Sequence, residues 1–145
     1  MIKNIWSQLD KIQAYLTWIP EIEEVFTGWI FAWKPVIPPT SGKYLWFELI
    51  NNSPKISNDT TWTTIKSALF HFYIVWNNKS TPDVELYEAI DILSNSVLTA
   101  EKDKIILENF EIWNISEWNQ SWVVKDTNEN PYIMAQYTMI YKYKI

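Results

Sequence analysis

The C-terminal segment, residues 130–145, alternates between two kinds of position. One alternate set is wholly apolar or aromatic: Ile133, Ala135, Tyr137, Met139, Tyr141, Tyr143 and Ile145. The intervening positions, from Tyr132 to Lys144, mix apolar and polar residues. A two-residue period with one apolar side is typical of a strand covered on one face. The chain is therefore predicted to end in a long, half-covered strand that carries no catalytic residues.

Two other segments show the helical period. In the first, apolar residues recur at spacings of three and four: Ile2, Ile5, Leu9, Ile12 and Leu16. Pro20 disfavours helical geometry in the residue before it, so this helix is predicted to end there. The second helix is predicted to start with Thr81 as N-cap and Pro82 at the first helical position. Its buried stripe is Leu86, Ala89, Ile90, Leu93 and Val97.

Strands are predicted between these helices. Val25–Phe26 and residues 29–33 read as short strands around Gly28, which is expected to mark a bend that needs positive φ or close packing. Residues 34–42 contain three prolines and predict a loop. Residues 43–50 alternate with Leu45, Phe47 and Leu49 on one side, as a strand does.

The remaining strands follow from the same period. Residues 51–59 are predicted to form a loop or hairpin tip. Residues 60–76 carry apolar side chains on both sides in their second half, which predicts a central strand covered on both faces. Three more strands are predicted at 104–115, 118–125 and 132–145, the last two joined by a polar hairpin loop.

The order of elements predicts the fold class. Two helices cannot cover both faces of a sheet of about seven strands. Residues 1–145 are therefore expected to form a single domain of the α+β class, a mostly antiparallel or mixed β-sheet with two α-helices packed on one face. The 10 Trp, 8 Tyr and 6 Phe exceed what one small core usually holds. We expect a partner to cover part of the opposite face, because Trp and Tyr are enriched at interfaces.

Composition narrows the function classes. The chain has no Cys, so disulfides and thiolate metal sites are excluded. A net charge of −5 argues against a general nucleic-acid binder, which would show a basic footprint. No stretch approaches a membrane span and the N-terminus lacks a secretion signal, so a soluble, intracellular product is expected.

Residues that could carry chemistry are few. The single His, His71, lies between Phe70 and Phe72 in a predicted strand, and a hydrogen-bonded sheet histidine is the favoured interpretation. No second His or Cys is present to complete a common transition-metal set. Gly28 and Gly42 alone cannot build a phosphate-binding loop.

Carboxylates and tryptophans are the other candidates. The carboxylates form three groups: Glu21, Glu23 and Glu24; Asp83, Glu85, Glu88 and Asp91; and Asp126 and Glu129 with Asn128. The first group reads as a surface patch, with pairing to lysines of a neighbouring subunit as the alternative. The second is the wet face of a helix, and the third lacks the glycine and distal Glu of a calcium loop. Six tryptophans could form a sugar-stacking platform, although packing is favoured: Trp29, Trp33, Trp46, Trp113, Trp118 and Trp122. We expect no catalytic, cofactor-binding or metal residues and no enzyme activity.

The layout of the whole chain resembles a known family. An amphipathic helix leads to residues 19–26 (IPEIEEVF), and a proline-rich stretch precedes Tyr44–Leu49 (YLWFEL). A long strand, a helix with Leu86–Leu93 (LYEAIDIL) and the segment Trp122–Tyr132 follow, before a strand ending YTMIYK. In element order the chain resembles the tail terminator (tail completion) proteins of long-tailed bacteriophages.

The resemblance implies a structural protein of the virion. Such subunits form a hexameric ring that caps the tail tube, ends its polymerisation and joins the tail to the neck and head connector. The implied partners are further copies of the chain, the tail tube protein and neck proteins, with DNA passing through the ring without sequence-specific binding. The implied location is the virion tail or neck, after assembly in the host cytoplasm. The alternatives are another neck, head-completion or tail-tube subunit, or a Trp-rich glycan-binding module.

Overall fold

The computed structural model describes residues 9–39, 42–58, 63–76, 83–103, 110–119, 122–127 and 129–144. The helices are α1 (Leu9–Thr17), α2 (Pro20–Val25) and α3 (Asp83–Asp103). The strands are β1 (Ile30–Ala32), β2 (Lys43–Asn58), β3 (Thr63–Trp76), β4 (Phe110–Asn119), β5 (Val124–Lys125) and β6 (Pro131–Lys144).

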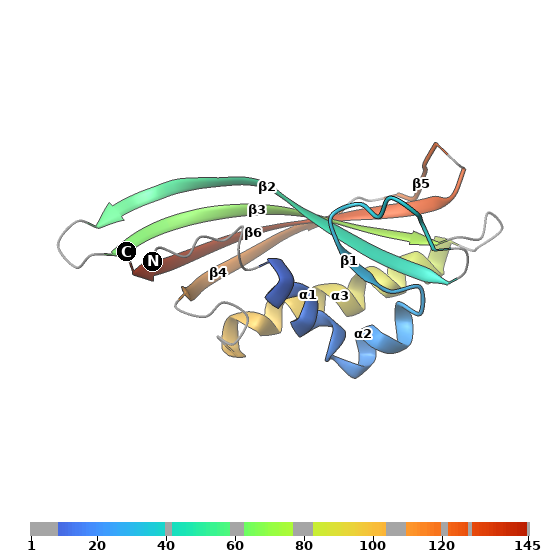
Figure 1. Ribbon diagram of the computed structural model, residues 1–145, viewed down its shortest axis with the longest axis horizontal. Coiled ribbons are helices and arrows are strands. Elements are labelled where there is room, and N and C mark those ends of the chain that lie inside the picture. Colours follow the sequence, from blue (N-terminus) through green and yellow to red (C-terminus); the bar gives the residue numbers. More distant parts are fainter. Residues whose placement is uncertain are drawn as a thin grey trace.

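The six strands form one mixed sheet in the order β1-β2-β3-β6-β4, and β5 pairs with β6 beside this path. Among the described strands, only β1 and β2 run parallel; the other pairs are antiparallel. All three helices lie on one side of the sheet (Figure 1). The α+β class and the mainly antiparallel sheet are as expected.

The helix count differs from the predicted two, and the reason is Pro20. Ile19 has an extended backbone, with φ −84° and ψ 115°, and Pro20 opens α2 at a position where a missing N–H costs nothing. The proline thus separates α1 from a second helix instead of a strand. Val25, predicted to lie in a strand, is the last residue of α2, and Phe26 is its C-cap.

The core lies between the sheet and the helices. Alternate strand residues point to this side and are buried: Leu45, Phe47, Leu49, Ala68, Phe70, Phe72, Ile74, Ile133, Ala135, Tyr137 and Met139. The helices add Leu9, Ile12, Leu16, Ile22, Leu86, Ala89, Ile90 and Leu93. Each large apolar side chain buried here contributes about 1.5–3 kcal/mol to stability. The predicted inward faces of β2, β3 and β6 and the helical stripes are confirmed over these residues.

Three strand boundaries differ from the predictions. The β2–β3 ladder continues through the predicted loop at 51–59, with register shifts on either side of the segment Asn51–Pro54. Pro54 is tolerated in β2 because this part of β2 is an edge. In the described part of the chain, β1 pairs only with Leu45–Phe47, so the outer side of β2 has no neighbouring strand at Pro54. β4 runs unbroken to Asn119, so the strand predicted at 118–125 shrinks to β5.

The predicted bend at Gly28 involves both glycines. Gly42, not Gly28, has the positive φ among the described glycines, at 80°. A Cβ added to Gly42 would clash with the Thr27 hydroxyl and lie 3.1 Å from the Gly28 nitrogen, so Gly42 is the glycine that has both the positive φ and the close packing. The expected N-cap at Thr81 and Pro82 lies outside the described residues.

No helix in the described parts of the chain combines the length and the apolar character needed to cross a membrane.

Candidate functional site

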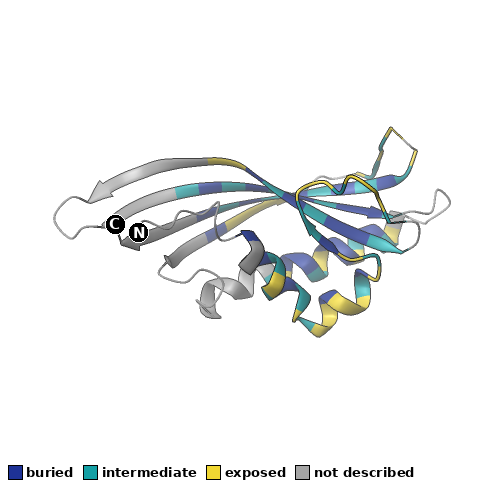
Figure 2. Cartoon of the chain, viewed as in Figure 1, coloured by how far each residue is buried: buried dark blue, intermediate teal, exposed yellow. Residues whose placement is uncertain are grey.

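The side of the sheet that faces away from the helices is here called the open face. The strand register places its residues in rows across the sheet: Tyr44, Val75 and Tyr132; Trp46, Tyr73 and Met134; Glu48, His71, Gln136 and Trp118; Leu69, Thr138 and Ser116. Most of these side chains are half-buried, in contrast to their fully buried neighbours on the helix side (Figure 2). The sequence predicted cover on both faces of β3, but among the open-face residues named here only Val75 of β3 and its neighbour Tyr44 of β2 are buried.

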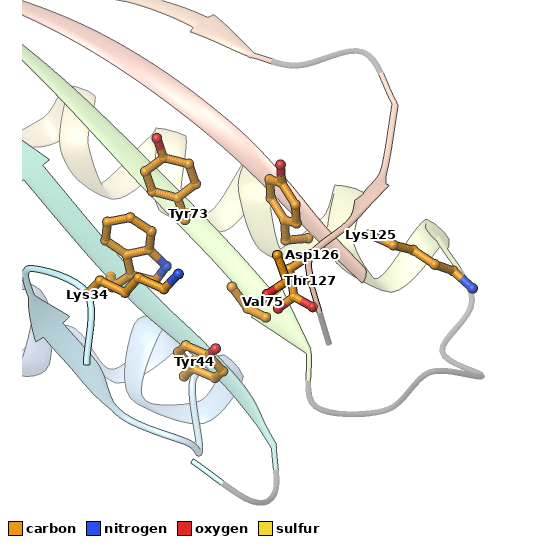
Figure 3. A pocket seen from close by; sticks show the side chains of 9 residues that line it. Lys34, Tyr44, Tyr73, Val75, Lys125, Asp126 and Thr127 are labelled. Atoms are coloured by element: carbon orange, nitrogen blue, oxygen red, sulfur yellow. The ribbon is translucent and has the colours of Figure 1, made fainter. Parts of the chain in front are cut away.

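One end of the open face forms a cavity of about 450 Å³, here called the aromatic pocket. Its lining comes from β2, β3, β5, β6 and the loops that follow β1 and β5: Lys34, Tyr44, Trp46, Tyr73, Val75, Lys125, Asp126, Thr127 and Tyr132. Figure 3 shows Tyr44, Tyr73 and Val75 along the sheet, with Lys34 on one side of them and Lys125 on the other, its side chain extending away from the rings. The volume lies within the range of small-ligand and side-chain pockets, roughly 300–1,000 Å³.

The rings in the pocket pack against one another. Trp46 and Tyr73 stack with centroids 4.0 Å apart and planes 11° apart. Tyr73 also meets Tyr132 at 6.2 Å, tilted by 52°. Because Trp46 and Tyr73 turn one ring face toward each other, those two faces are not available to stack on a sugar. A ligand or side chain that enters the pocket can therefore contact the ring edges and the remaining ring faces.

A hydrogen-bonded row lies beside the pocket. The Tyr73 hydroxyl donates to Glu48 Oε1 at 3.3 Å and lies 3.4 Å from His71 Nδ1. His71 Nε2 is 3.2 Å from Gln136 Oε1 on the neighbouring strand. The expectation of a hydrogen-bonded sheet histidine at position 71 is confirmed. Burial, with the charge and hydrogen bond of Glu48 second, raises the pKa of Tyr73 to about 12.

The β5–β6 turn forms one wall of the pocket. Asp126 Oδ1 accepts the Asn130 N–H at 2.8 Å, and the Asp126 carbonyl accepts the Glu129 N–H at 2.9 Å. Asp126 therefore organises the turn, as aspartates at hairpin ends commonly do. Burial and then the negative charge of Asp126 raise the pKa of Tyr44. Asn128 lies outside the described residues, and the described residues hold no group of three His, Asp or Glu side chains suited to a metal ion.

The tryptophans of the predicted sugar platform are dispersed. Trp46 lies in the pocket, while Trp118 lies on β4, with β3 and β6 between them, about 14 Å away at the usual strand spacing. Trp29 and Trp33 flank β1 with positive φ angles of 98° and 74°. Trp122 precedes β5, and the side chain of Trp113 is outside the described set. Trp46 and Trp118, the two on the open face, are therefore not brought together.

The first two of the three acidic groups lie on the helices. Glu21, Glu23 and Glu24 are exposed on α2, although the sequence placed them before a strand. On α3, Glu88 and Asp91 are exposed and Glu85 is half-buried, as expected of a wet helical face; the side chain of Asp83 is not described.

A partly buried polar contact was missed by the sequence analysis. Ser94 of α3 donates to Glu117 Oε2 of β4. Burial raises the pKa of the nearby Tyr137 hydroxyl far above its usual value. No local pattern could have revealed this contact, because Ser94 and Glu117 are 23 residues apart. It joins α3 to the outer strand of the sheet.

Several exposed apolar residues were also not singled out from the sequence. Trp18, between α1 and α2, is 84% exposed, and Val36 and Ile37, in the proline-rich loop, are 97% and 84% exposed.

Neither a scan against protein-family models nor a search of curated proteins found a match for this chain. The open face and these exposed side chains are therefore what bears on function.

Proposed function

We propose that this chain is a structural protein of a bacteriophage virion, a tail terminator. Six copies form a ring that caps the tail tube, ends its polymerisation and joins the tail to the neck. The observation that carries the proposal is the open face, where aromatic side chains line a pocket with no helix over them. Such a surface suits contact with another protein, because aromatic residues dominate the energy of protein interfaces.

Two further features support a ring. Exposed Trp18 belongs to the helical side and the aromatic pocket to the opposite side. The molecule therefore has two different potential contact surfaces on different faces. A ring needs such a heterologous contact, in which one patch meets a different patch on the next copy. The net charge of −5 also suits a ring through which DNA slides, because a basic lumen would retain the phosphates.

The test is to remove the protein from the virus that encodes it and image the particles. We expect tail tubes longer than in the wild type and not joined to heads, with wild-type lengths restored by supplying the protein. Normal virions would refute the role. Heads joined to tubes of normal length that leak DNA would instead point to a neck or head-completion subunit.

A glycan-binding module is the remaining alternative from the sequence. The dispersed tryptophans and the mutual stacking of Trp46 with Tyr73 do not favour it. Binding of the isolated monomer to a glycan array would revive that alternative.

A further inference from the structure

Trp18 and two glutamates close to it in sequence are exposed on the helical side. Trp18 directly follows α1 and is 84% exposed. Glu21 and Glu24 are exposed and, at a spacing of three residues, share one face of α2. Figure 1 shows the connection between α1 and α2 on the side of the helical layer that faces away from the sheet. This patch, Trp18 with Glu21 and Glu24, is here called the Trp18 knob.

The aromatic pocket has the complementary character on the other side of the molecule. Tyr44, Tyr73 and Tyr132 supply ring edges and faces, against which an indole packs favourably in edge-to-face geometry. Lys34 and Lys125, both exposed, lie on two sides of the pocket (Figure 3). They outnumber Asp126, the one carboxylate in the lining, so the lining carries two positive charges against one negative charge. The cavity of about 450 Å³ is large enough for an aromatic side chain.

We propose that the Trp18 knob of one copy inserts into the aromatic pocket of the next copy. The indole of Trp18 fills the pocket between the tyrosines. Glu21 and Glu24 then pair with the positive rim of the pocket, formed by Lys34 and Lys125. A second copy of this chain is the occupant because an acidic knob and a basic-rimmed pocket are charge-complementary and lie on opposite sides of the same molecule. This inference rests on the proposed ring and names its subunit contact.

The contact is heterologous, so every copy uses its knob on one neighbour and its pocket on the other. Repetition of one such contact gives a closed ring when the rotation between copies closes, and a filament when it does not. Trp in a desolvated pocket is a frequent centre of binding energy, with charged pairs at the rim adding specificity and faster association. The indole is thus expected to supply most of the affinity, and the charges the choice of partner.

A charge exchange tests the contact in the full-length chain. The variant Glu21→Lys with Glu24→Lys has a basic knob and a basic-rimmed pocket. The variant Lys34→Glu with Lys125→Glu has an acidic knob and an acidic-rimmed pocket. At low salt, each variant alone should self-associate at least tenfold more weakly than the wild type in sedimentation experiments. An equimolar mixture should recover wild-type association, because every knob then meets a pocket of opposite charge. Association of each variant at the wild-type level, or a mixture that stays monomeric, overturns the proposal.

Removing the indole tests the centre of the contact. Trp18→Ala should weaken self-association by about thirtyfold, as expected for a Trp hot spot. Trp29→Ala is the matched control, because Trp29 is also exposed, at 56%, but belongs neither to the knob nor to the pocket lining. The control should associate like the wild type. Equal effects of the two changes would contradict a specific knob. A wild-type chain that stays monomeric up to millimolar concentration would also overturn the proposal.

The two proposals fail in different ways. Wild-type self-association that depends on Trp18, together with normal virions after removal of the protein, would end the tail-terminator role and leave the contact standing. Overlong tubes after removal, rescued equally well by the wild type and by Trp18→Ala, would end the contact and leave the role standing.

Discussion

The two sides of strand β3 differ in how far they are buried. On the helix side, Phe72 is 3% exposed and stacks on Phe47 with centroids 5.0 Å apart. One residue further, on the open face, Tyr73 is half-exposed and stacks on Trp46 at 4.0 Å. Both sides are aromatic, yet only one is covered by the chain itself. The helix side accounts for folding, and the open face is the surface left for a partner.

The largest expected loss of stability comes from a substitution on the helix side of β3. Phe72→Ala removes a ring that also meets Tyr137 edge-on at 5.3 Å, and should lower the free energy of unfolding by about 3–5 kcal/mol. Tyr73→Ala on the same strand should cost less, because that side chain is only partly buried. Urea denaturation of the two variants measures the difference. Equal losses would mean that the open face is as much part of the core as the helix side.

The next largest loss of stability is expected at Gly42, in the connection between β1 and β2. Gly42→Ala forces a side chain onto a residue with φ of 80° and against Thr27 and Gly28. We expect a loss of about 1–3 kcal/mol in thermal or urea unfolding, from backbone strain and the clash. Val36→Ala, in the same connection but almost fully exposed, should change stability by no more than about 0.5 kcal/mol. A neutral Gly42→Ala would show that the connection can relax away from Gly28.

The smallest effect is a pH dependence on the open face. The pKa of Tyr73 is raised from its ordinary 10.0 to about 12 in the folded protein. Its contribution to stability is therefore fully present below pH 10, and is lost as pH rises through 12, because the unfolded chain gives up the phenol proton first. Tyr73→Phe should make the alkaline decline shallower without abolishing it, because the pKa of Tyr44 and Tyr137 is also raised. An unchanged decline in Tyr73→Phe would contradict the buried, Glu48-linked position of this hydroxyl.

The sequence predicted the fold better than the site, for physical reasons. The alternation in β2, β3 and β6 and the stripe in α3 depend on local spacing, which burial enforces directly. Pro20 was misleading because a proline both ends one helix and suits the first position of another. The continuation of β2 through Pro54 was missed because an edge strand tolerates a residue that a central strand would reject.

The aromatic pocket could not be predicted in the same way. Its walls come from residues as far apart as Lys34 and Tyr132, and only the register of β2, β3 and β6 brings them together. The surplus of aromatic residues did signal an interface, but not its position. Nor does a single exposed residue such as Trp18 leave a periodic trace that could be recognised in the sequence.

The most direct test of the open face as a subunit contact is electron cryomicroscopy of tail tubes assembled with this protein. The account predicts a ring of six copies at one tube end, with the aromatic pocket of each copy covered by its neighbour. Tubes of unchanged length with no added density at either end, or a ring whose pockets all face solvent, would contradict it.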